Sequence, residues 1–217
     1  MLPTAGRIQV LLVHEEIPLA TNYVLIDYEN VQPKNLELLL KHPFKVYVFV
    51  GENQAKIPFD LADKMQLLGR DAEYRKISGN GQNALDFHIA YYIGELAGKD
   101  SGSQFHIISK DKGFDPLIRH LREAKKIQIR RETDLIEIPL LQLPTSTSMD
   151  EKIAAIVKNL GGRGQSRPRK VRTLQNTINT LFTKKLDKKE LSALVSELEK
   201  RKLIVVNQTN VSYKLPH

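Results

Sequence analysis

The chain of 217 residues contains no cysteine, and this absence removes several kinds of chemistry at once. Disulfide bonds, thiolate metal sites and a cysteine nucleophile are excluded. The sequence also lacks any apolar run near the roughly 20 residues that a membrane span needs. The apolar segment at residues 10–13 is too short for a signal peptide. We therefore expect a cytoplasmic protein with no membrane partner, in which residues 1–20 form either an added strand or an unstructured extension.

The first two thirds of the chain have no excess of positive charge. Residues 1–148 contain 18 Lys and Arg against 19 Asp and Glu, whereas residues 149–217 contain 15 against 6. The net charge of +8 therefore comes from the last third of the sequence. This asymmetry indicates two modules, the second with a polyanionic partner. A solvated basic surface without a partner is the alternative.

An apolar run at residues 23–26 stops at Asp27 and predicts a buried strand of a parallel sheet. Apolar and helical patterns predict four further strands, at residues 44–50, 72–77, 105–108 and 127–130, and helices that begin near Pro33, Pro58, Gln82 and Pro116. Strands that alternate with helices imply βαβ units. We therefore predict a three-layer α/β/α domain with a mostly parallel sheet. The polar strand at residues 72–77 should lie near a sheet edge, and Leu36, Leu39 and Leu40 should form one buried helix face.

A different pattern follows the segment at residues 140–148, which has no helical signature and is predicted to be a linker. Ser148 with Glu151 and Asp187 with Glu190 have the spacing of capping boxes at helix starts. Another helix lies between these two, and two short strands follow them. Three helices and a hairpin are the order of a winged helix-turn-helix, a small α+β fold. We therefore predict domains at residues 21–139 and 149–217.

Several acidic residues are placed where a parallel sheet binds its ligands, beyond the carboxyl ends of the strands. Asp27 and Asp111 each end a strand, Asp115 lies four residues later, and Asp86 lies inside a helix. Clustered carboxylates repel one another unless a cation compensates them. Oxygen ligands without Cys or His favour Mg²⁺ or Mn²⁺. Such a site can activate water for phosphodiester hydrolysis.

Asp27 is hard to explain by structure alone, because the apolar strand leads straight into it, but three other polar residues have a purely structural interpretation. Asp115 before Pro116 has the pattern of a helix N-cap followed by proline. Asp86 can be a paired acid in the core. Asn30, three residues after Asp27, can simply form a turn.

Three segments carry a resemblance to a known family: Leu25–Asn30 (LIDYEN), Asn83–His88 (NALDFH) and Ile108–Leu117 (ISKDKGFDPL). They resemble motifs of PIN-like (NYN-type) nuclease domains, and the resemblance covers about residues 22–140. It implies metal-dependent hydrolysis of single-stranded nucleic acid, usually RNA rather than DNA. It also implies that the chain can form a homodimer. By this likeness the metal-site positions are Asp27, Asn30, Asp86, Asp111 and Asp115.

The chain departs from the family pattern beside Asp111, where many relatives have a second acid. Here Lys110 and Lys112 flank Asp111. Two cations at this place can bind substrate phosphates or weaken the binding of a metal. This departure supports a second hypothesis, a non-catalytic nucleic-acid-binding regulator built on the same fold.

The C-terminal part resembles the winged-helix modules of OST-HTH (LOTUS) type that are attached to PIN-like domains. Its basic residues, together with the two lysines beside Asp111, are predicted to contact nucleic-acid phosphates: Lys110, Lys112, Arg167, Arg169, Lys170, Arg172, Lys188 and Lys189. Winged helices also bind proteins, so this module leaves two kinds of partner open. A phosphatase acting on small phosphate esters is a third hypothesis, although such a substrate does not need a basic module.

Overall fold

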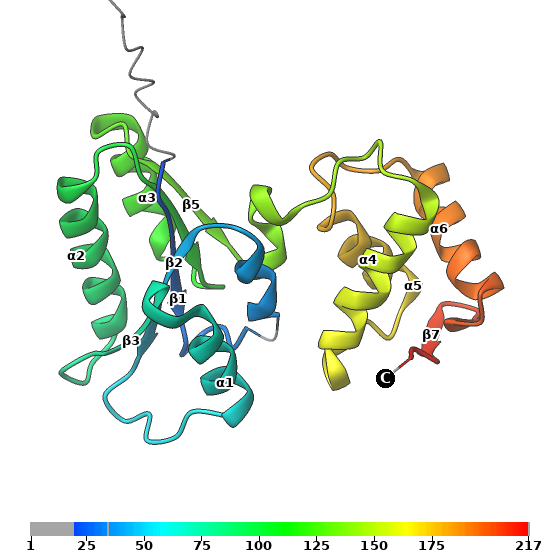
Figure 1. Cartoon of the computed structure of the whole chain (residues 1–217), viewed down its shortest axis with the longest axis horizontal. Coiled ribbons are helices and arrows are strands. Elements are labelled where there is room, and N and C mark those ends of the chain that lie inside the picture. Colours follow the sequence, from blue (N-terminus) through cyan, green and yellow to red (C-terminus); the bar gives the residue numbers. More distant parts are fainter. Residues whose placement is uncertain (1–19, 34, 217) are drawn as a thin grey trace, which may run out of the picture.

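The computed structural model describes residues 20–33 and 35–216, so the prediction for the first 19 residues lies outside the described chain. The first half contains a five-stranded parallel sheet with the order β3–β2–β1–β4–β5 (Figure 1). Its strands are β1 (Asn22–Asp27), β2 (Phe44–Val50), β3 (Ala72–Lys76), β4 (Gln104–Ile108) and β5 (Gln128–Glu132). The strand order changes direction between β1 and β4. A parallel sheet binds ligands at the carboxyl ends of such a strand pair.

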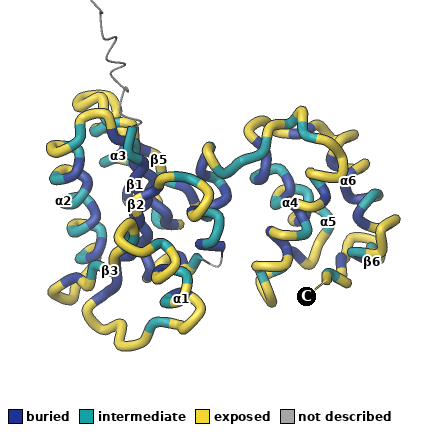
Figure 2. The backbone as a smooth tube through the Cα atoms, viewed as in Figure 1, coloured by how far each residue is buried: buried dark blue, intermediate teal, exposed yellow. Residues whose placement is uncertain are grey.

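Helices cover both faces of this sheet, as the three-layer prediction requires. They are η1 (Leu36–Lys41), α1 (Phe59–Leu68), η2 (Gly69–Asp71), α2 (Ala84–Lys99) and α3 (Phe114–Ala124). Successive side chains of a strand point to opposite faces. Val24 and Ile26 of β1 therefore pack with η1 and α1, while Tyr23 and Leu25 pack with α2 and α3. Figure 2 shows β1 buried between these layers.

Most of the predicted elements are confirmed, and β3 does lie at a sheet edge. Some details were wrong, among them the helix starts near Pro33 and Pro116, since these helices begin at Leu36 and Phe114. Leu40 is 46% exposed, because η1 is a 3₁₀ helix that repeats every three residues and buries only Leu36 and Leu39. The helix expected from Gln82 begins at Ala84, because Asn83 has a left-handed backbone with φ of 64°.

The C-terminal half contains three α-helices and an antiparallel hairpin in the order that the sequence predicted. Its elements are η3 (Leu135–Glu137), η4 (Pro139–Leu141), α4 (Met149–Gly162), η5 (Gly164–Ser166), α5 (Val171–Asn179), α6 (Lys188–Lys200), β6 (Ile204–Asn207) and β7 (Asn210–Tyr213). Both capping boxes are present, at the starts of α4 and α6. The helices and the hairpin surround an apolar core of their own.

The two halves are in contact along the segment that joins them. Ile136 of η3 packs into the C-terminal core although it lies within residues 21–139, the predicted first domain. The Leu143 amide donates to the carbonyl of Leu181 over 2.8 Å, and the Thr183 amide donates to the carbonyl of Leu143 over 3.0 Å. Part of the predicted linker is therefore hydrogen-bonded to the C-terminal half. The domain boundaries at residues 139 and 149 stay a prediction.

In the part of the chain that the structure describes, no helix combines the length and the apolar composition needed to cross a membrane.

Candidate active site

Asp27 ends β1 with its side chain completely buried. The alternation along the strand turns it toward the face that α2 covers. Its Oδ2 atom accepts hydrogen bonds from Ser109 Oγ at 2.6 Å and from Asn30 Nδ2 at 2.7 Å, and its Oδ1 atom accepts from the Asn30 amide at 3.2 Å. Asn30 thus forms the turn and also orients the carboxylate, so its two interpretations are compatible.

Ser109 connects Asp27 to the loop after β4, and sequence reasoning had not singled it out. It is fully buried, and its Oγ accepts a hydrogen bond from the Asp111 amide at 3.0 Å. The Gly113 amide in turn donates to Asp111 Oδ1 at 2.7 Å. A polar residue directly after an apolar strand was the available signal. Its contact with Asp27 depends on the pairing of β4 with β1, which is a long-range feature.

Asp86 lies in the first turn of α2 and is half-buried. Burial, together with the negative charges of Asp27, Asp111 and Glu29, raises the pKa of its carboxyl to about 6. Within the described residues its side chain forms no ion pair or hydrogen bond, so the interpretation as a paired core acid is wrong. Acids from three separate elements therefore converge on this edge of the sheet.

Glu29 is a further acid of this cluster that sequence reasoning missed. It is exposed in the turn after β1, and its side chain lies across the end of β2. A Cβ atom at Gly51 would lie 1.9 Å from Glu29 Oε1. The carboxylate of Glu29 can occupy this position only because residue 51 has no side chain. The signal in the sequence was an acid inside the same turn as Asp27 and Asn30.

Asp115 has a different environment from the other predicted metal ligands. Arg131 of β5 donates from Nε to Asp115 Oδ1 at 2.8 Å and from Nη2 to Oδ2 at 3.2 Å. These hydrogen bonds lower the pKa of the Asp115 carboxyl. The prediction of Asp115 as an N-cap was wrong, because α3 already begins at Phe114 and Gly113 is its N-cap. Arg131 Nη1 also donates to the Ser109 carbonyl at 3.1 Å. Arg131 therefore connects β5 to both ends of the loop between β4 and α3.

The acidic cluster provides oxygen donors alone, which suits a hard divalent cation. Among the residues that the structure describes, no three His, Asp or Glu side chains are close enough to hold an ion directly. Mg²⁺, however, keeps several of its waters and needs only one or two carboxylates. Burial and the repulsion by neighbouring carboxylates raise the pKa of Asp86, and a hydrated cation would relieve this repulsion. Asp27, Asp86 and Asp111 therefore fit such an ion, because in the described chain only neutral groups hydrogen-bond to them. The charge of Asp115, by contrast, is already paired with that of Arg131.

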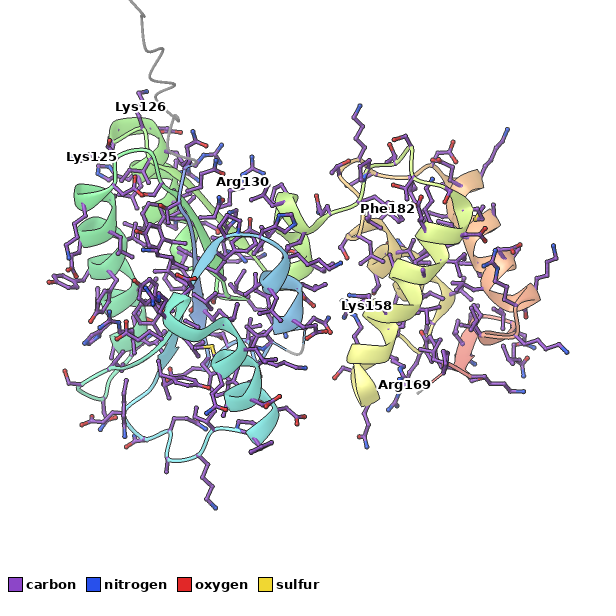
Figure 3. The ribbon with its side chains drawn as sticks, viewed as in Figure 1. Lys125, Lys126, Arg130, Lys158, Arg169 and Phe182 are labelled. Carbon is purple, nitrogen blue, oxygen red and sulfur yellow. The ribbon has the colours of Figure 1, made fainter. Side chains whose placement is uncertain are left out.

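The predicted phosphate-contacting residues fall into two groups. Lys110 and Lys112 are exposed on either side of Asp111, and five of the predicted residues in the C-terminal half are exposed as well: Arg169, Lys170, Arg172, Lys188 and Lys189. Figure 3 labels Arg169 on that half. Arg167 differs from them, because its Nε donates to the Leu160 carbonyl at 2.7 Å at the end of α4. This arginine therefore has a structural role.

Lys110 also lines a polar cleft of about 360 Å³ between the two halves. Thr177 of α5 and Arg163 lie on the other side of this cleft. The loop after β4 consequently faces both the acidic cluster and the C-terminal half.

Comparison with protein families gives one match. The family model described as PIN domain matches residues 21–131, just over half of the chain. No curated protein and no solved structure matches the chain. The matched segment runs from β1 to β5 and contains every acid of the cluster.

Proposed function

Because the chain belongs to the PIN domain family, whose members are generally metal-dependent nucleases, we propose that it is an endonuclease of single-stranded nucleic acid. RNA is the substrate class that we favour, and the NYN type is the subgroup that its motifs resemble. The observation that supports this proposal is the convergence of Asp27, Asp86 and Asp111 at the carboxyl ends of the strands.

In this proposal Asp27, Asp86 and Asp111 hold Mg²⁺ or Mn²⁺. The bound ion would activate water and stabilise the leaving oxygen of a phosphodiester. Ser109 and Asn30 keep the Asp27 carboxylate in one orientation, and the Gly113 amide orients Asp111. Such fixed carboxylates need little rearrangement when a charged substrate arrives.

The C-terminal half would act as a winged-helix module that holds the substrate. Its exposed arginines and lysines can contact phosphates without reading sequence. Attachment to the catalytic half raises the local concentration of a bound strand at the acidic cluster. We propose the predicted boundaries, residues 21–139 and 149–217, for these two modules.

Cleavage of labelled single-stranded RNA and DNA in the presence of Mn²⁺ tests the proposal. Asp27→Asn and Asp111→Asn should each lower the rate by at least about 100-fold, because each removes a charged metal ligand. Asp63→Asn, at an exposed position of α1, is the matched control and should retain the wild-type rate. Equal activity in all four proteins would reveal a contaminating nuclease and end the proposal.

A non-catalytic nucleic-acid-binding regulator remains the second candidate. It is favoured by the exposed lysines on both sides of Asp111 and by the absence of a tight acidic triad among the described residues. This candidate predicts salt-dependent binding without metal-dependent cleavage. Removal of residues 149–217 should then abolish binding, and undiminished binding would count against it.

A further inference from the structure

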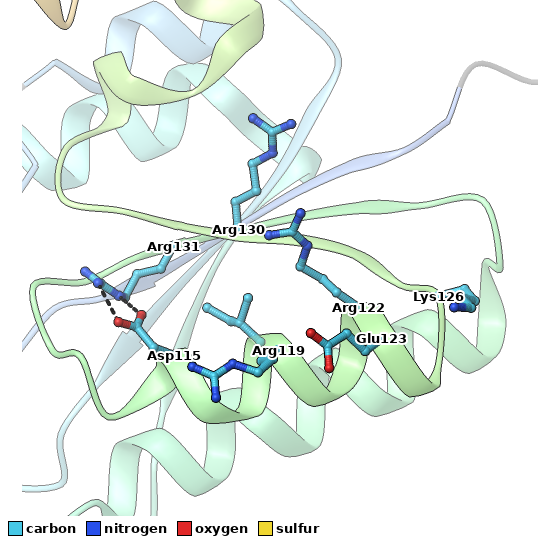
Figure 4. Close-up of a pocket in the computed structure, with 8 residues that line it drawn as sticks. Asp115, Arg119, Arg122, Glu123, Lys126, Arg130 and Arg131 are labelled. Atoms are coloured by element: carbon cyan, nitrogen blue, oxygen red, sulfur yellow. Dashed lines mark hydrogen bonds and ion pairs between the residues drawn. The ribbon is translucent and has the colours of Figure 1, made fainter.

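A groove of about 930 Å³ lies where α3 packs beside the edge strand β5 (Figure 4). Cations dominate its lining: Arg119, Arg122, Lys126, Arg130 and Arg131. Asp115 and Glu123 are the acids in that lining. The groove belongs to the half of the chain that has no overall excess of positive charge, so its basic character is a local arrangement.

Three arginines of this groove are open to an external anion, although the charge of Arg119 also acts on Asp115 and lowers the pKa of that carboxyl. Within the described residues, the side chains of Arg119, Arg122 and Arg130 form no hydrogen bond or ion pair. All three are exposed, and in Figure 4 Arg122 reaches from α3 toward the strand that carries Arg130. Because the cations of this groove outnumber its acids by five to two, it favours an anionic ligand. Guanidinium groups are especially suited to phosphate, which they bind through two parallel hydrogen bonds.

The groove begins beside the acidic cluster. Arg131 lies at its inner end, where it donates to the Ser109 carbonyl, and Ser109 Oγ donates to Asp27. Lys126 lies at the other end, before β5 starts, and Figure 3 labels it beside Lys125. The 11 residues of α3 span about 16 Å.

We propose that this groove binds the phosphodiester backbone of a single-stranded nucleic acid and directs the strand to the acidic cluster. The inference takes its substrate class from the proposed function. It adds a binding surface on the catalytic half, separate from the basic C-terminal half. Solvated surface charges that bind nothing are the alternative.

A pair of double variants of the full chain tests the groove. Arg122→Gln with Arg130→Gln removes two charges from it, whereas Arg70→Gln with Lys45→Gln removes two exposed charges near the opposite edge of the sheet. Binding of labelled oligouridylate and oligothymidylate is measured by fluorescence anisotropy in EDTA over a range of salt concentrations. EDTA separates binding from any metal-dependent cleavage.

The groove variant should bind roughly five- to tenfold more weakly than wild type, and the control double should stay within about twofold. The slope of log K against log salt should become shallower by about 1.4, since each lost phosphate contact on a single strand contributes about 0.7. Arg122→Lys with Arg130→Lys should restore most of the slope, because it keeps the charge. A loss for both oligonucleotides would indicate backbone recognition of either nucleic acid, and a loss for oligouridylate alone would restrict the groove to RNA.

Equal affinity and equal slope in the two double variants would overturn the groove proposal. That result would not bear on the proposed nuclease activity, because cleavage is not measured in EDTA. Conversely, weaker binding by the groove variant in a protein that never cleaves would support the groove and refute the endonuclease.

Discussion

Asp27 is a buried carboxylate whose geometry is set by its neighbours. Ser109 and Asn30 together supply three hydrogen bonds to it. The sequence identified Asp27 and Asn30 because they lie within one local segment. It did not identify Ser109, whose contact with Asp27 spans 82 residues and exists only because β1 and β4 are adjacent.

Ser109→Ala should lower metal-dependent cleavage by about 10- to 100-fold. Loss of a residue that hydrogen-bonds to a metal ligand and orients it typically reduces metal affinity or activity by that factor. It should also cost about 1–2 kcal/mol of stability, since the Asp27 carboxylate loses one buried donor. Ser103→Ala is a matched control, because Ser103 is a buried serine directly before β4, at the end remote from the acids. Kinetics and urea unfolding measure the two effects. Equal losses of activity in both variants would contradict an orienting role for Ser109.

Asp86 makes the metal-free protein sensitive to pH. Its pKa is about 6 in the folded protein, against 3.8 as the ordinary value. The folded state therefore binds this proton more tightly than the unfolded chain, so stability falls as pH rises from about 4 to about 6. Above about pH 6 the Asp86 carboxylate is charged in the folded protein, and the loss of stability that this charge causes stays constant.

Asp86→Asn should consequently stabilise the protein in EDTA near neutral pH. We expect a gain on the order of 1 kcal/mol, because screening in this partly exposed site reduces the roughly 1.36 kcal/mol that accompanies each pKa unit. The gain should shrink as pH approaches about 4, where the wild-type carboxyl is protonated as well. Urea unfolding at several pH values measures it, and a gain independent of pH would contradict the assigned cause.

At the scale of elements, sequence patterns predicted a helix start correctly where the capping side chain and the amide that it binds lie within a few residues of each other. Ser148 and Asp187 form the capping boxes that their spacing indicated. Asp115 did not become a cap, because the partner of its carboxylate is Arg131, 16 residues further along on β5. Neither residue reveals this pairing by itself, since it requires α3 to pack beside that strand.

Asp187→Ala should destabilise the C-terminal half by about 1 kcal/mol, the usual cost of losing an N-cap. Its carboxylate accepts a hydrogen bond from the Glu190 amide at 2.8 Å, and that amide would lose its partner. Ser196→Ala, at an exposed position of α6, should change stability by less than about 0.5 kcal/mol. Urea unfolding compares the two variants, and equal midpoints would show that the cap contributes nothing.

For the whole molecule, the sequence predicted which segments are strands and helices but not which strands lie together. The alternation of elements gave the α/β/α fold. The strand order decides that Asp27, Asp86 and Asp111 converge and that Arg122 lies near Arg130. The acids could be anticipated from strand ends, whereas the groove could not, because its cations come from a helix face and a neighbouring strand.

The connection between the two halves was also only partly visible in the sequence. Ile136 looks like part of the first domain, yet it packs with the core of the second. Leu38 of η1 packs against the same core. Contacts across sequence-defined boundaries depend on how the two halves meet, which hydrophobic periodicity within one segment does not encode.

The two outer strands of the sheet have one more consequence, for how copies of the chain can associate. β3 carries Glu73, Arg75 and Lys76, and β5 carries Arg130 and Arg131. Charged side chains on outer strands oppose the addition of a strand from another molecule. A continuous intermolecular sheet is therefore disfavoured on both sides. If the chain forms a homodimer, its subunits should meet through helices or through the C-terminal half.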